Sequence, residues 1–136
     1  MTNNSTNNVP ETAMFVCYGD MSNVGILSGL ASLEALQKVP KEKAWIFCLG
    51  GLPTEALTVL AKTKAVKRII TVDGCPLHCS KKIVEQAGFV PTHTLTLTED
   101  CNIKKGSPES WSDSDMEITV NAIIDVIMDK NSYEPN

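Results

Sequence analysis

Two of the chain's five cysteines lie four positions apart in the stretch TVDGCPLHCSKK, residues 71–82. Cys75 and Cys79 stand on either side of an expected turn into a helix. Two thiols at such a place can pack in the core, act as a redox pair or supply part of a metal site. The choice depends on where the sequence places the other three cysteines, which are Cys17, Cys48 and Cys101.

Short apolar runs alternate with helical patterns along the chain, and each run predicts a strand. The expected strands are residues 13–18, 43–51, 67–74 and 92–100, and the expected helices are residues 22–39, 52–64, 75–88 and 115–130. This alternation predicts a single three-layer α/β domain with a mostly parallel four-stranded sheet and helices on both faces. Right-handed crossovers favour the strand order 2-1-3-4.

Capping signals set the expected helix boundaries. Ser22 or Asn23 is suited to begin the first helix, and Thr54 the second. Pro76 suits the first turn of the third helix, and Gly88 suits its C-terminal cap. Both cysteines of the opening stretch are therefore expected to border the first turn of the third helix.

The cysteines fall at the ends of the expected strands. Cys17 and Cys48 end the first two strands, Cys75 follows the third, and Cys101 follows the fourth. Carboxyl ends of parallel strands share one edge of a sheet, and open α/β sheets bind ligands there, where the winding reverses. Core packing is the alternative for any single cysteine. Packing does not predict that all of them gather at one end.

Zinc is the ion that such a cluster favours. Zinc binds thiolates at about 2.3 Å in tetrahedral sites, and neighbouring strands lie about 4.8 Å apart. Cys17, Cys75 and Cys79 are thus expected to converge on one ion. Cys48 starts two strands away from the third strand, and it joins only if the loop with Gly50 and Gly51 folds inward. Otherwise the thiols divide into two incomplete sites.

Three further side chains lie near these cysteines in the sequence. Asp73 either ligates the metal, orients a ligand or caps the third helix. His78 faces away from the neighbouring cysteines by helical angle and is expected on the surface. Cys101 has no clear ligand geometry, and its neighbours Glu99 and Asp100 are either oxygen ligands or solvated residues.

Two further functions compete with metal binding. Cys75 is a candidate nucleophile of a thiol-redox or persulfide-transfer enzyme, with Cys79 or Cys17 as the resolving thiol. The loop from Cys17 to Gly25 leads into a helix, as in flavodoxin-like binders of phosphate-bearing ligands. That loop lacks the GK[ST] ending of a P-loop, and Asp20 within it would repel an anion. Enzyme status stays open.

Composition limits the partners and the compartment. The chain has 136 residues and a net charge of −4, which gives no overall support for binding nucleic acid or an anionic membrane. No secretory signal and no membrane-length apolar run occurs. We expect a disordered tail at residues 1–12, one domain at 13–131, a second tail at 132–136 and a cytoplasmic location where thiols stay reduced.

The motifs CYGDMSNVGILS, FCLGG and VDGCPLHCSKKIVEQAG together resemble the DGC-domain family, small proteins to which zinc binding is attributed. The resemblance covers about residues 14–130, with the motifs in order and at matching separations. It implies that the family's four characteristic cysteines are Cys17, Cys48, Cys75 and Cys79. It further implies zinc as the cofactor, at one site or two, without an established reaction.

Overall fold

The structure is a computed structural model that describes residues 8–129. Residues 1–7 of the first predicted tail, residues 130–131 of the predicted domain and the whole second tail lie outside that range. The strands are β1 (Thr12–Val16), β2 (Ala44–Ile46), β3 (Arg68–Asp73) and β4 (His93–Thr96). The helices are α1 (Asn23–Leu36), α2 (Leu57–Ala65), α3 (Cys79–Gln86), α4 (Leu97–Asp100) and α5 (Asp113–Met128), with a short 3-10 helix, η2 (Leu49–Gly51). β1 thus includes Thr12, the last residue of the predicted N-terminal tail.

The four strands form one parallel sheet in the order β2-β1-β3-β4, which confirms the predicted topology. β1 and β3 are central, and Val16 is in register with Val72. The backbone N–H of Cys17 donates to the carbonyl of Val72 at 2.9 Å, so the pairing extends past the last residue of β1. The segments that follow β1 and β3 therefore leave the sheet side by side at its carboxyl edge.

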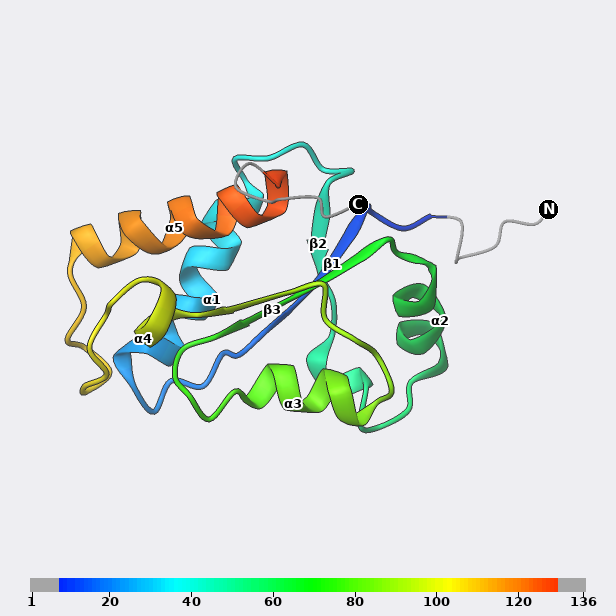
Figure 1. Cartoon of the computed structure of the whole chain (residues 1–136), viewed down its shortest axis with the longest axis horizontal. Helices are drawn as coiled ribbons and strands as arrows, with labels where there is room; N and C mark the ends of the chain where they lie inside the picture. Colours follow the sequence, from blue (N-terminus) through cyan, green and yellow to red (C-terminus); the bar gives the residue numbers. More distant parts are fainter. Residues whose placement is uncertain (1–7, 130–136) are drawn as a thin grey trace.

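Helices cover both faces of the sheet, as Figure 1 shows: α1 and α5 lie on one side, and α2 and α3 lie on the other. Alternate residues of each strand point to opposite faces. Met14 and Val72 therefore pack under α1 and α5, whereas Phe15 and Ile69 pack under α2 and α3. None of the helices in residues 8–129 combines the length and apolar character needed to cross a membrane.

Two predicted helix starts are wrong, and local hydrogen bonds explain both. α2 begins at Leu57 rather than residue 52, because the Thr54 hydroxyl donates to the Gly50 carbonyl at 2.7 Å and holds a turn instead of a cap. α3 begins at Cys79 rather than Cys75. The backbone N–H of His78 donates to the Cys75 carbonyl at 3.1 Å, and His78 has φ 54°, so a tight turn precedes the helix.

Two helix ends agree with the sequence, whereas β2 and β4 are shorter than predicted. Ser22 caps α1 by accepting from the backbone N–H of Gly25 at 3.2 Å, and Gly88 ends α3 with φ +94°. β4 stops at Thr96, four residues before the predicted end, because the Asp100 carboxylate accepts from the Thr96 N–H at 2.7 Å. This bond folds Leu97–Asp100 into α4 and carries the chain away from the sheet edge.

Candidate functional site

Three cysteines from two distant segments line one pocket at the carboxyl ends of β1 and β3. The pocket has a volume of about 260 Å³, and Cys17, Cys75 and Cys79 contribute to its wall. It lies where the winding reverses, because α1 leaves β1 for one face of the sheet and α3 follows β3 on the other. This is the crevice in which open α/β sheets bind their ligands.

Cys17 and Cys75 are half-buried, whereas Cys79 is exposed. Burial raises the pKa of the Cys17 thiol above its ordinary value, and the negative charge of Asp73 raises it further. The backbone N–H of Gly19 donates to the sulfur at 3.5 Å and opposes this pKa shift. A cation that offsets the negative charge would therefore favour the thiolate form here.

The Asp-Gly-Cys triplet after β3 has one physical role for each residue. Asp73 is 2% exposed, and its carboxylate accepts from the backbone N–H groups of Ser80 at 2.8 Å and Lys81 at 3.1 Å. Gly74 lies against the backbone of α1, where an added Cβ would come within 2.6 Å of the Val24 carbonyl group. Cys75 then faces the pocket.

Asp73 therefore caps α3, which is the alternative to metal ligation that the sequence left open. Each of its carboxylate oxygens already accepts a backbone hydrogen bond at the start of the helix. This bond pair fixes where α3 begins and so where Cys79, its first residue, lies. Metal ligation by Asp73 stays a prediction.

Cys48 lies apart from this pocket, on the exposed surface. The segment after it forms η2 and then places Leu52 in the core beneath α2 and α3. Gly51 packs so closely on α2 that an added Cβ would lie 2.7 Å from the Val59 side chain. Gly51 thus allows η2 to pack against α2, and the structure does not bring Cys48 to the other three thiols.

Cys101 is buried in the core under α1 and α5 and does not line the pocket. Burial raises the pKa of the Cys101 thiol, and the charge of Asp100 raises it further. Its surroundings are those of a packed residue, as expected for a small apolar side chain.

Two side chains of the pocket that carry a nitrogen, those of His78 and Lys105, were not predicted to lie there. His78 lines the pocket, because the turn before α3 replaces the helical geometry that would have turned it outward. Lys105 comes from the loop between α4 and α5, and its ammonium Nζ lies 3.5 Å from the Cys75 sulfur. The position of His78 was missed because the start of α3 was predicted four residues too early. No local signal in the sequence indicates the contact between Lys105 and Cys75.

The donor chemistry of the pocket fits zinc, which prefers thiolate and imidazole ligands. Within residues 8–129, no three His, Cys, Asp or Glu side chains already converge closely enough to hold a metal ion. The three thiols share a pocket wall, and they would have to come closer together to hold a common ion.

The phosphate-binding alternative gains no support from the start of α1. The backbone N–H of Asn23 donates to Gly106, that of Val24 to the Asn23 side chain, and that of Gly25 to Ser22. These amides are the groups that a helix N-terminus would offer to an anion. All three already have partners within the protein.

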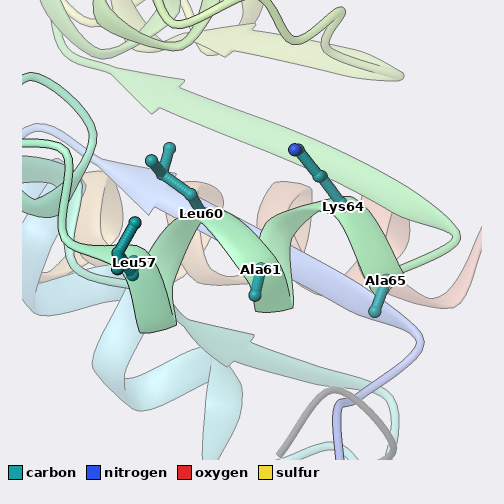
Figure 2. Close-up of a pocket in the computed structure, with 5 residues that line it drawn as sticks. All are labelled: Leu57, Leu60, Ala61, Lys64 and Ala65. Carbon is teal, nitrogen blue, oxygen red and sulfur yellow. The ribbon is translucent and has the colours of Figure 1, made fainter.

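A larger hollow, about 560 Å³, lies on α2 and has none of this chemistry. Figure 2 shows its five lining residues, with Ala61 and Ala65 directed to one side of the helix and Leu60 and Lys64 to the other. Aliphatic side chains and one lysine cannot ligate zinc. The smaller thiol pocket is therefore the candidate site.

Comparison with known proteins gives one family. The model of the DGC domain matches residues 13–123, a range that contains all five cysteines. A relative from Pseudomonas aeruginosa, the anaerobic and virulence modulator AnvM, is 32% identical over 108 residues, which cover 79% of this chain and 79% of the relative. No solved structure matches the chain.

Proposed function

The chain belongs to the DGC-domain family, as its cysteine motifs indicated, and from this premise we propose that it is a zinc-binding protein of the cytoplasm. Cys17, Cys75 and Cys79 are the thiolates that would hold the ion. The observation that carries the proposal is their position around a single pocket at the switch between β1 and β3.

The structure supports three cysteine ligands better than four. Cys48, the fourth cysteine of the predicted set, is held away by the packing of η2 and Leu52. A zinc ion held by three thiolates would act as a Lewis acid, and it would have one coordination position left for a further ligand. Sites of this kind exchange ligands, whereas a four-thiolate site is closed. We assign no reaction to the protein.

The chain's own residues prepare this arrangement. Asp73 fixes the first turn of α3 and thereby the position of Cys79. Gly74 permits the turn after β3 to lie against α1, which brings Cys75 towards the segment of Cys17. The proposed cytoplasmic location follows from chemistry, because a site of free thiols requires a compartment that keeps them reduced.

Metal analysis of the purified protein tests the proposal. The protein is expressed without a histidine tag, purified without chelator, and analysed for zinc, iron, copper and nickel by mass spectrometry. We expect about one equivalent of zinc per chain, and its release by a strong chelator should expose thiols to a colorimetric reagent. Less than about a tenth of an equivalent, in the presence of added zinc, would refute the proposal.

Thiol transfer by Cys75 is the second candidate, and the proximity of Lys105 to the Cys75 sulfur favours it. A cation beside a sulfur promotes nucleophilic attack by that sulfur. Thiol titration of metal-free protein separates the two candidates. A transfer enzyme should have one fast-reacting thiol that added zinc does not protect, whereas the zinc site should protect several thiols together.

A further inference from the structure

The loop between α4 and α5 brings a lysine to the thiol pocket. Lys105 lines the pocket, and its Nζ donates a hydrogen bond to the Cys75 sulfur at 3.5 Å. No ion pair with a carboxylate engages Lys105 in the part of the chain that the structure describes. Lys105 is exposed, and within the described residues the Cys75 sulfur is the partner of its ammonium group.

A single buried side chain fixes the backbone on both sides of Lys105. Asn23, which is 2% exposed, donates through Nδ2 to the Lys104 carbonyl at 2.9 Å, and its Oδ1 accepts from the Gly106 N–H at 2.7 Å. The same Nδ2 donates to the Ser110 carbonyl at 3.0 Å. The position of Lys105 beside Cys75 thus follows from a defined network that ties the loop to the start of α1.

A cation beside a metal site of three thiolates would offset part of its negative charge. Three thiolates carry three negative charges and a zinc ion two positive charges, so their complex has a net charge of about −1. Burying part of that charge is costly unless it is paired, and a hydrogen-bonded ammonium group pairs it directly.

We propose that Lys105 is a positioning and charge-compensating residue of the thiol pocket, held in place by Asn23. The inference rests on the proposed function, and it concerns a residue that lies outside the cysteine motifs. The ammonium group donates to the Cys75 sulfur and balances the excess negative charge of the three thiolates. Removal of a side chain that hydrogen-bonds to a metal ligand typically weakens metal binding by about 10–100-fold.

Zinc affinity in three variants tests the role of Lys105. Lys105→Met should raise the zinc Kd by about 10–100-fold in competition with a chromophoric chelator. Lys104→Met removes the same charge one residue earlier, from an exposed side chain that does not line the pocket, and serves as the matched control. Lys105→Arg keeps the positive charge, so its zinc affinity should stay within about threefold of that of the unmodified protein.

Cobalt in place of zinc gives a readout that general destabilisation would not change. A hydrogen bond to a thiolate sulfur makes it a weaker electron donor. The thiolate-to-cobalt charge-transfer band should therefore move to lower energy in Lys105→Met, and should stay in place in Lys104→Met and Lys105→Arg. Melting temperatures of the metal-free variants show whether each remains folded.

The outcomes separate this inference from the proposed function. If the unmodified protein binds neither zinc nor cobalt, both fail together. If it binds zinc but Lys105→Met binds it within about twofold and leaves the cobalt band unchanged, the role of Lys105 is wrong and the zinc site stands. Equal losses in Lys105→Met and Lys104→Met would likewise refute a specific role, because net charge alone would explain them.

Discussion

The ends of β1 and β3 differ sharply from the end of β2, although each is the carboxyl end of a parallel strand followed by cysteine. At β1 and β3, helices depart to opposite faces and leave a pocket with three thiols in its wall. At β2, η2 and Leu52 turn into the core, and Cys48 stays exposed. A sheet edge is therefore not one uniform site. The thiols gather at the position where the winding reverses, which is where open α/β sheets bind their ligands.

Serine substitutions should separate the two regions most strongly. Cys75→Ser removes a thiolate of the proposed site and should weaken zinc binding by more than about 100-fold, beyond the effect of a residue that only orients a ligand. Cys48→Ser should change the affinity by less than about threefold, because Cys48 does not line the pocket. Chelator competition measures both. If both variants lost zinc affinity to a similar extent, Cys48 would be a ligand as well, and the two regions would not differ in function.

Alanine at two glycines tests the packing behind the contrast. Gly74→Ala would force a methyl group within 2.6 Å of α1 backbone and should lower the free energy of unfolding by about 1–3 kcal/mol. Gly50→Ala, near Cys48, meets no atom within 4 Å and should change it by less than about 0.5 kcal/mol. Urea denaturation of metal-free protein gives both values. A well-tolerated Gly74→Ala would show that the close approach to α1 is dispensable.

Asn23 should influence both stability and the metal site. Asn23→Ala removes the hydrogen bonds to residues 104, 106 and 110 and should cost about 1–3 kcal/mol of unfolding free energy. It should also weaken zinc binding, because Lys105 would no longer be held beside Cys75. Asn121→Ala, at an exposed position on α5, is the control and should have neither effect. Unchanged zinc affinity in a folded Asn23→Ala variant would argue against the network's role.

The smallest expected effect concerns pH. The pKa of Cys101 is raised in the folded protein, so the folded state holds this proton more tightly than the unfolded chain does. Its contribution to stability is present below the ordinary thiol pKa and is lost as the pH rises through the raised value. Cys101→Ala should therefore flatten the alkaline decrease in stability of metal-free protein, whereas Cys48→Ala should not. Identical slopes in the two variants would contradict the burial of Cys101.

The sequence predicts the sheet and its order because apolar runs and crossover handedness suffice for them. It also predicts that Cys17, Cys75 and Cys79 lie at one edge of the sheet, because the carboxyl ends of parallel strands share an edge, and the three line one pocket there. It wrongly predicts Thr54 as a helix cap and His78 as a surface residue. Hydrogen bonds within the turns that precede α2 and α3 decide where these helices begin, and the sequence pattern does not reveal them. It misses Lys105 because the contact with Cys75 joins residues thirty positions apart through Asn23, and no periodic pattern encodes such a link.

Metal-dependent thiol labelling tests the central claim most directly. The five cysteines are alkylated in the presence and absence of one equivalent of zinc, and the labelled positions are assigned by peptide mass spectrometry. The account predicts that zinc protects Cys17, Cys75 and Cys79 together while Cys48 is labelled equally in both samples. Protection of Cys48 along with the others, or no protection at the three pocket cysteines, would contradict it.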